Sequence, residues 1–183
     1  MGIFHIEDRL KNQPDIIRSY AWEVIIPEIG SVSESAKDSE DLVIRARITS
    51  IPSRGNEKIE SNFVGMKQFF PGKPTFSNTI SITFEEFEDQ LVGKIMYEWA
   101  NKIFDIRANS PTGGGAQVDK KRDIAKLIII KQYDYNSQEL KLGYKLHNCF
   151  IENIEEVTLD YTSNESIKIP ITFSYDFFEM LKI

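Results

Sequence analysis

The chain has 183 residues, of which 41% are hydrophobic and 27% are charged, and its formal net charge is -6. This size and composition predict one folded domain, residues 1–183, with its own hydrophobic core. The negative charge disfavours nucleic-acid binding, because phosphates would be repelled. The longest apolar run, Leu127–Ile130, is too short to cross a bilayer, so we expect no membrane insertion.

The sequence predicts neither a signal peptide nor an internal disulfide. Met1–Leu10 mixes His5 and charged residues with apolar ones, which is not the pattern of a signal peptide. Cys149 is the only cysteine, so an internal disulfide is impossible and assembly in a reducing cytoplasm is favoured. We treat residues 1–17 as an amino-terminal segment that precedes the first strand.

Alternating apolar and polar residues, which are typical of half-buried strands, recur along the chain. Residues 28–41 interrupt this pattern with Ser, Glu and Asp, and predict an exposed loop. Two polar stretches, Asp134–Gln138 and Thr162–Glu165, predict hairpin turns. The expected strands are Tyr20–Ile26, Leu42–Thr49, Thr79–Glu85, Ile124–Ile130, Leu140–Phe150, Val157–Tyr161 and Ile167–Phe177.

One segment has helical spacing instead. Its apolar residues recur every three or four positions and predict an amphipathic helix over 88–105 with a buried stripe. Glu88 and Asp89 would favour the positive end of the helix dipole, and Lys102 the negative end. The stripe consists of Leu91, Val92, Ile95, Met96, Trp99 and Ile103.

The predicted fold is therefore mainly β: an antiparallel β-sandwich or barrel with one packed helix. A long hairpin loop, residues 52–74, precedes the strand that leads into the helix. A parallel α/β sheet would need more helices than this sequence offers.

The sequence carries little material for chemistry. His147 and Cys149 share a strand face, but two ligands do not make a metal site. Gly72-Lys73 is followed by Pro74 where a phosphate-binding loop needs Ser or Thr, and Asp134–Glu139 lacks the glycine of a calcium loop. We predict no catalytic, cofactor or metal site, and no enzymatic activity.

Several segments, in order, resemble those of a known family. Arg18–Ile26 and Arg45–Pro52 look like its first two strands, Glu57–Phe84 like its long hairpin and following strand, and Met96–Ala100 like its helix. Asn148–Ile154, Leu159–Asn164 and Ile169–Asp176 look like its last segments. Over Arg18–Glu179 the chain thus resembles the tail tube proteins of contractile-tailed phages. The loops Ser31–Asp41 and Gly113–Gly115 look longer than in compact members.

The resemblance implies a structural subunit that forms hexameric rings, stacked into the inner tail tube through which DNA or other cargo is ejected. It implies a place in the virion tail after assembly in the host cytoplasm. Its partners would be other copies of itself, the tail sheath, and the tape-measure and baseplate proteins. DNA would pass through the lumen without specific binding.

Two sets of residues are the candidates for assembly and transport. Exposed aromatic residues in a loop indicate an interface, so we expect the hairpin to reach a neighbouring ring. Small, slightly acidic strand faces would keep a polyanion from sticking, so we expect them to line the lumen. The interface candidates are Arg54, Ile59, Phe63, Phe69 and Phe70, and the lumen candidates are Thr79, Ser81, Thr83, Glu85, Thr172, Ser174 and Asp176.

Other readings remain open from the sequence alone. The same resemblance fits the inner tube or tube initiator of a phage-like secretion, pyocin-like or extracellular injection system. Strand alternation by itself fits a β-barrel that binds a small ligand in its interior. Assembly discriminates between them, because a binding module stays small in solution and a tube protein forms rings or tubes.

Overall fold

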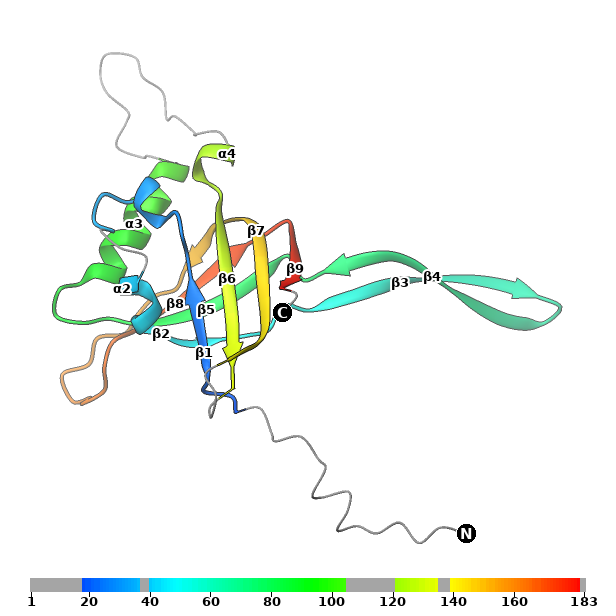
Figure 1. Ribbon diagram of the computed structural model, residues 1–183, viewed down its shortest axis with the longest axis horizontal. Helices are drawn as coiled ribbons and strands as arrows, with labels where there is room; N and C mark the ends of the chain where they lie inside the picture. The colour runs from blue at the N-terminus through cyan, green and yellow to red at the C-terminus, as the bar shows by residue number, and fades with distance from the viewer. Residues whose placement is uncertain (1–17, 37–39, 105–120, 135–138, 182–183) are drawn as a thin grey trace, which may run out of the picture.

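The computed structural model describes residues 18–36, 40–104, 121–134 and 139–181. One curled antiparallel sheet encloses the core, and a two-stranded hairpin projects from one end of it (Figure 1). The mainly β fold with a packed helix is confirmed. Two predicted features, the segment 1–17 and the Gly113–Gly115 loop, lie outside the described residues, and so do residues 135–138 of the predicted turn Asp134–Gln138.

The strand order of the main sheet is β1-β6-β7-β8-β5-β2, and β9 pairs with β7; the hairpin is β3-β4. All pairings are antiparallel. The strands are β1 (Trp22–Ile25), β2 (Ala46–Thr49), β3 (Arg54–Phe63), β4 (Met66–Phe76), β5 (Thr79–Glu85), β6 (Lys126–Tyr133), β7 (Leu140–Ile154), β8 (Lys168–Ser174) and β9 (Phe177–Leu181).

The long strand β7 joins the two halves of the sheet. Its first part pairs with β6 on one edge and β9 on the other, and its last residues pair with β8. At the junction Asn148 adopts a left-handed backbone, φ 57°, and its Nδ2 donates to Asp176 Oδ2 at 2.8 Å. The register of β7 with β9 continues into its register with β8, because His147 is opposite Phe177 and Phe150 is opposite Ser174. At Asn148, β7 and the β8–β9 segment therefore bend together. This turn lets the two halves enclose one core.

The core is formed by inward-facing residues of both halves and of the helix α3 (Leu91–Ile103). Trp99 is fully buried, its ring centroid lies 5.6 Å from that of Phe173 on β8, and its Nε1 donates to Ile124 O at 2.9 Å. Val92, Ile95 and Met96 are also fully buried. The predicted helical stripe is therefore core, and the helix is shorter at each end than the predicted 88–105.

The entrance of α3 differs from the sequence expectation. Glu88 and Asp89 precede the helix, and the first turn contains no acidic residue. Asp89 Oδ1 nevertheless accepts from Leu91 N at 3.3 Å, and Glu86, which the sequence analysis did not single out, adds two acceptors: its Oε1 accepts from Val92 N at 3.2 Å and its Oε2 from Gly93 N at 2.7 Å. A carboxylate at this position satisfies two helix donors and favours the positive end of the dipole.

A buried arginine links this entrance to the start of β2. Arg45 is 7% exposed; it donates to both carboxylate oxygens of Asp89, at 2.8 and 2.5 Å, and its Nη1 lies 3.6 Å from Glu86 Oε1. These hydrogen bonds lower the pKa of Asp89. Two carboxylates thus neutralise a cation that would be costly to bury alone.

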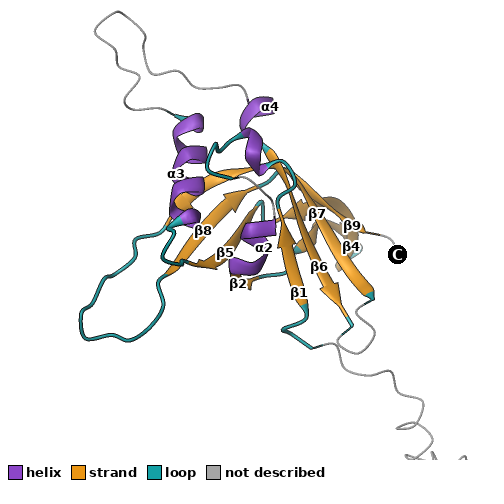
Figure 2. Ribbon diagram, turned by 60° about the vertical axis from the view of Figure 1, so that its left-hand side comes forward, coloured by secondary structure: helices purple, strands orange, loops and turns teal. Residues whose placement is uncertain are grey.

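Arg45 ends the short helix α2 (Glu40–Arg45), where a strand was predicted from Leu42 onward. That part of the prediction is wrong. Leu42 and Arg45 are buried and Ile44 is exposed. Burial of every third residue is typical of a helix, but over so few residues the sequence pattern does not separate a helical turn from a strand. α2 contacts both β1 and β5 and lies across the opening between the sheet halves (Figure 2).

Two further predictions need correction. Residues 28–41 are not merely an exposed loop, because the short 3-10 helix η1 (Ile29–Ser31) and the residues after it bury Ile29, Val32 and Ala36 in the core. Val157–Tyr161 is not a strand: it lies in the β7–β8 connection, and Leu159 is 77% exposed. Val157–Tyr161 has no free edge of β8 to pair with, because both edges of β8 are already paired, with β5 and β7.

The short helix α4 (Lys121–Ile124) precedes β6 and contains the basic residues Lys121 and Arg122. No helix in the described ranges is long and apolar enough to cross a membrane.

The segment after η1 is fastened to α3 by one carboxylate. Glu98 Oε2 accepts from Ser33 Oγ at 2.5 Å and from Ser35 N at 3.1 Å, and its Oε1 accepts from Ser35 Oγ at 2.5 Å. Hydrogen bonds from Ser33 and Ser35 hold the pKa of Glu98 below its ordinary value of 4.5. The contribution of Glu98 to stability is therefore complete above pH 4.5 and is lost as the pH falls through the lowered pKa.

We predict that Glu98→Gln destabilises the protein by about 1 kcal/mol at neutral pH, because charge-assisted hydrogen bonds become neutral ones. The difference from the wild type should shrink as the pH falls below about 4. Chemical denaturation across pH 3 to 7 measures this. Glu88→Gln, at an exposed position, is the control and should show no comparable pH-dependent difference.

Candidate assembly surfaces

The hairpin is the outward continuation of the pair β2–β5. β3 follows β2 and β4 leads into β5, so one antiparallel pair leaves the sheet and extends into solvent (Figure 1). Every residue of β3 is exposed, and so is all of β4 except Gly72 and Phe76. At about 3.3 Å per residue the eleven residues of β4 span about 35 Å. The predicted hairpin loop 52–74 thus corresponds to the two-stranded hairpin β3–β4, which has one register shift between Asn56 and Lys58.

The tip of the hairpin is a two-residue turn at Val64 and Gly65, closed by the pair Phe63 and Met66. Both central residues have positive φ, 49° and 78°, as a type I′ turn requires. Valine is unfavourable in this left-handed region, because its branched Cβ crowds the backbone. Val64 is nevertheless there, and it is 83% exposed.

The register sorts the hairpin side chains onto two faces, because directly opposite residues share a face. One face is apolar near the tip: Ile59 is opposite Phe70, and Phe63 is opposite Met66. All four side chains are at least half exposed. Three of the predicted interface residues therefore share one face with Met66, which the sequence analysis missed, and the polar pair Ser61 and Gln68 lies between the two apolar pairs.

Phe69 lies on the other face, which is charged. It is opposite Glu60, its ring lies 4.2 Å from Lys58 Nζ, and Lys67 Nζ lies 2.5 Å from Glu60 Oε1. Arg54, the fifth predicted residue, is at the hairpin base opposite Phe76. The structure thus divides the predicted interface set between two faces and the base.

An aromatic cluster holds the hairpin base against the sheet. The ring of Phe178 on β9 makes edge contacts with Phe76, Tyr144 and Tyr175, at centroid distances of 5.4, 5.9 and 6.4 Å. Ser77 Oγ and Tyr175 Oη are 2.7 Å apart. This cluster fixes the direction in which the hairpin leaves the sheet.

The polar face predicted from alternation exists on β5 and β8. Thr79 is opposite Ser174 and Ser81 is opposite Thr172, so these residues share one face, with Thr83 and Glu85 further along β5. The alternate residues Ile80, Ile82 and Phe84 are buried in the core. The polar face lies on the side of the β5–β8 ladder opposite α3, because α3 packs on the buried side, where Trp99 contacts Phe173.

The two carboxylates predicted on this face are each paired with a cation. Glu85 Oε2 lies 2.5 Å from Arg47 Nη2, and hydrogen bonds from Ser166 and Arg47 lower its pKa. Asp176 lies at the bend, where Lys121 Nζ is 2.5 Å from Oδ1; hydrogen bonds from Lys121 and Asn148 lower its pKa. The face is consequently closer to neutral than its carboxylates alone suggest.

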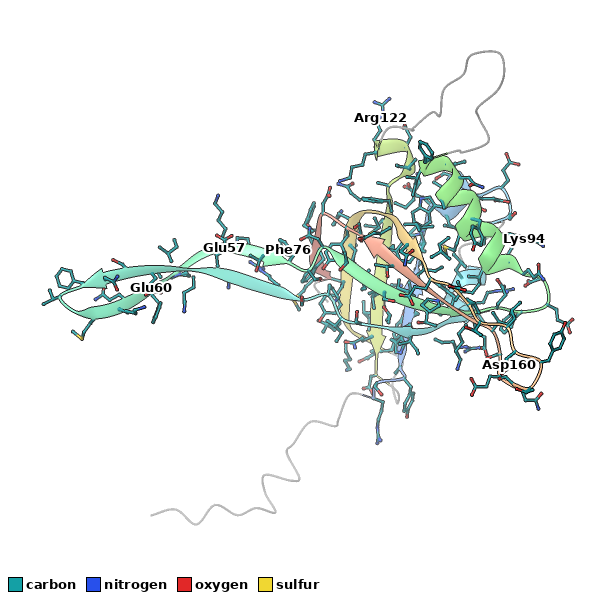
Figure 3. All side chains as sticks on the ribbon, turned by 180° about the vertical axis from the view of Figure 1, so that it is seen from behind. Glu57, Glu60, Phe76, Lys94, Arg122 and Asp160 are labelled. Atoms are coloured by element: carbon teal, nitrogen blue, oxygen red, sulfur yellow. The ribbon has the colours of Figure 1, made fainter. Side chains whose placement is uncertain are left out.

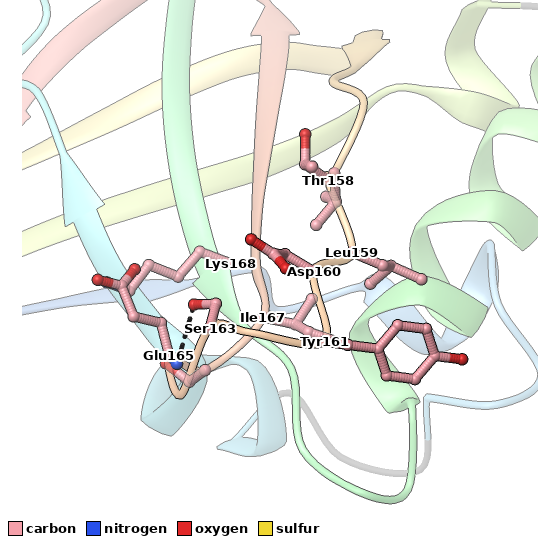
Figure 4. Close-up of a pocket in the computed structure, with 10 residues that line it drawn as sticks. Thr158, Leu159, Asp160, Tyr161, Ser163, Glu165, Ile167 and Lys168 are labelled. Carbon is pink, nitrogen blue, oxygen red and sulfur yellow. Dashed lines mark hydrogen bonds between the residues drawn. The ribbon is translucent and has the colours of Figure 1, made fainter.

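The β7–β8 connection is a second projecting feature. Its base is closed, because Glu155 N donates to Pro170 O at 3.0 Å and Glu86 N to Ile167 O at 2.9 Å. Its residues surround a pocket of about 640 Å³ (Figure 4). The pocket is lined by Val157–Tyr161, Ser163 and Glu165–Lys168.

The described residues offer no catalytic constellation. No group of three or more His, Cys, Asp or Glu side chains among them could hold a metal ion. Cys149 is buried and burial raises its pKa to about 12, while the ring of His147 stacks on Phe177 at 4.6 Å. The interior of the fold is occupied by large buried side chains such as Trp99 and Phe84, which disfavours a ligand-binding barrel.

Comparison with known proteins identifies the fold and the family. The family model described as phage tail tube protein matches residues 16–181. The chain belongs to the phage tail tube protein family. No curated protein matches the sequence.

Solved structures with the same fold come from contractile injection systems. A chain of the PVC sheath-tube complex of an extracellular contractile injection system, in the extended state, is 19% identical with a TM-score of 0.63; the match covers 97% of this tail tube protein and 98% of that chain. The tube-terminating cap of the anti-feeding prophage is 20% identical, with a TM-score of 0.65 and 93% of each chain covered. The PVC sheath/tube terminator is 21% identical, with a TM-score of 0.65, and 93% and 99% are covered.

We predict that Phe178→Ala lowers the free energy of unfolding by about 2–3 kcal/mol, because one truncation removes three aromatic contacts and leaves a cavity. Hydrogen exchange of the hairpin base, around Phe76, should accelerate at the same time. Phe177→Ala, at the exposed neighbouring position, is the matched control and should have a smaller effect. Equal effects from both variants would contradict the role of the cluster.

Proposed function

We propose that this tail tube protein is the inner tube subunit of a contractile tail or related injection machine, and that it forms hexameric rings stacked into a tube. The carrying observation is the long hairpin, which is exposed along its length. An isolated two-stranded hairpin is marginally stable in water. A second copy that covers it would supply the missing packing.

The hairpin is proposed to reach the neighbouring ring through the predicted residues and the apolar face that they share with Met66. Four large apolar side chains at the exposed end of a hairpin are expensive to leave in water, at about 25 cal/mol per Å² of apolar surface. Burying them between rings would stabilise the stack. The proposed interface residues are Arg54, Ile59, Phe63, Phe69 and Phe70.

Ring formation is proposed to use the two ends of the sheet path, β1 and β2. Each carries a strand edge with backbone groups that can pair with another chain. Joining the β1 edge of one copy to the β2 side of the next would continue the sheet around a closed ring.

The polar face of β5 and β8 is proposed to line the channel. Its hydroxyl side chains are small, and Glu85 and Asp176 are each paired with a cation, so it offers a sliding polyanion neither concentrated positive charge nor apolar surface. DNA or other cargo would pass without specific binding. The residues are Thr79, Ser81, Thr83, Glu85, Thr172, Ser174 and Asp176.

The proposal has consequences for partners and location. A tube of this kind would be wrapped by a sheath protein, would contact tape-measure and baseplate proteins, and would form in the host cytoplasm before it becomes part of the tail. Its role would be structural rather than enzymatic.

Negative-stain electron microscopy of the purified protein tests the proposal. The wild type should form rings about a sixfold axis and stacked tubes. The double variant Phe63→Ser, Phe70→Ser should retain rings and lose tubes, because the apolar hairpin face is removed while the sheet edges are intact. Asn62→Ser, on the opposite hairpin face, is the control. Normal tubes from the double variant would refute the role of the hairpin, and a monomeric wild type would refute the proposed function.

Thiol labelling tests the channel assignment. Ser81→Cys should react with a polymer-linked maleimide in unassembled protein and be protected in tubes, because the polymer cannot enter the channel. Lys94→Cys, on α3 at the other side of the sheet, should react in both states. Cys149 is expected to stay unreactive, because burial raises its pKa to about 12. Full labelling of Ser81→Cys in tubes would contradict a lumen position.

A further inference from the structure

The hairpin and the β7–β8 connection lie at opposite ends of one ladder. β5 begins at Thr79, next to the hairpin base, and ends at Glu85, whose partner on β8 is Lys168, the residue that ends the connection. In Figure 3 Glu57 and Glu60 mark the projecting hairpin, and Asp160 marks the connection on the far side of the sheet. Two different features at opposite ends provide the two unlike surfaces that a head-to-tail contact requires.

The connection has the form of a loop whose interior is not filled. Loops with closed ends are normally packed by their own side chains. Here the base is fixed by backbone hydrogen bonds, yet the loop surrounds a pocket of about 640 Å³. Leu159 and Tyr161 are among the most exposed large side chains of the described residues. An apolar rim around an open pocket is expected to receive a partner segment.

The charges of the two features are complementary. The hairpin, residues 54–76, carries Arg54, Lys58, Lys67 and Lys73 against Glu57 and Glu60, a net charge of +2. The connection, residues 155–168, carries Glu155, Glu156, Asp160 and Glu165 against Lys168, a net charge of -3. The Asp160 carboxylate is held ionised, because hydrogen bonds from Thr162 N and Oγ1 lower its pKa. The net positive hairpin of one copy would therefore be attracted to the net negative connection of another.

The dimensions agree with contact between successive copies. β5 has seven residues and spans about 23 Å, whereas the hairpin reaches about 35 Å beyond the start of β5. The hairpin leaves the sheet at the start of β5, so its whole length extends past its own subunit. In a head-to-tail row the next copy presents the end at which the connection lies, and that end is within reach of the hairpin.

We propose that residues 155–168 form the receptor for the β3–β4 hairpin of a second copy of this chain, so that each copy donates a hairpin at one end and accepts one at the other. This inference rests on the proposed function, and it specifies the partner surface of the hairpin. The apolar hairpin residues pack on the rim formed by Leu159 and Tyr161, and the hairpin lysines face the carboxylates of the connection.

A charge-reversal experiment on the full-length protein tests the pairing. Lys58→Glu with Lys73→Glu makes the hairpin net negative, and Glu156→Lys with Glu165→Lys makes the connection net positive. Each double variant should raise the threshold concentration for tube formation at least tenfold at low salt, and the four-substitution combination should return it to within about threefold of the wild type. Lys94→Glu with Arg122→Glu, away from both features, should leave the threshold unchanged.

The outcomes separate the two proposals. If the hairpin variant impairs tubes but the connection variant does not, or if the combination fails although circular dichroism and ring formation are normal, the receptor assignment is wrong and the tube function stands. If the wild type forms neither rings nor tubes, the proposed function falls, and this inference with it.

A second measurement needs no substitution. Wild-type tubes treated with an amine-specific cross-linker should yield links between Lys168 and the hairpin lysines Lys58, Lys67 or Lys73, identified by mass spectrometry, and single rings should not. Within one subunit these lysines lie at opposite ends of the β5–β8 ladder. Tubes without such links would overturn the assignment.

Discussion

The β5–β8 ladder is the constraint on which the rest of the structure depends. It pairs seven consecutive residues of each strand without a register shift. One face of it supplies buried residues to the core and packs against α3, and the other presents hydroxyl side chains. Its two ends carry the hairpin and the β7–β8 connection. A one-residue slip would exchange the two faces and reverse every assignment.

The surfaces proposed for assembly lie apart from the core. The core is closed by α3, by the buried residues after η1 and by the Arg45 cluster with Glu86 and Asp89, none of which involves the hairpin tip. The hairpin is tied to the body through the aromatic cluster at Phe178. Covering the hairpin with a second copy, as proposed, would therefore leave the packing of the core unchanged.

The features that could be predicted from the sequence are those that local periodicity determines. The alternation of β5 and β8 and the stripe of α3 are strong patterns, and the segment order resembled the family to which the chain belongs. The features that depend on contacts between residues distant in sequence could not be predicted. Val157–Tyr161 alternates as a strand would, but both edges of β8 are already occupied. Phe69 and Phe70 are neighbours in a strand and so lie on opposite faces, but only the register with β3 shows that Phe69 shares its face with Glu60 and Phe70 shares its face with Ile59. Glu86 caps a helix that begins five residues later, beyond the usual capping positions.

The prolines of β4 bear on how the free protein avoids uncontrolled aggregation. Long exposed strands are templates for pairing with any other strand, and proline is tolerated at such an edge where its missing N–H would face solvent. Pro71 and Pro74 stand opposite Lys58 and Asn56, on either side of a register shift. With two donors removed and lysines nearby, the free edge of β4 is a poor template for fibril growth. The exposed aromatic side chains of the hairpin are therefore less able to drive strand-to-strand aggregation of the free protein.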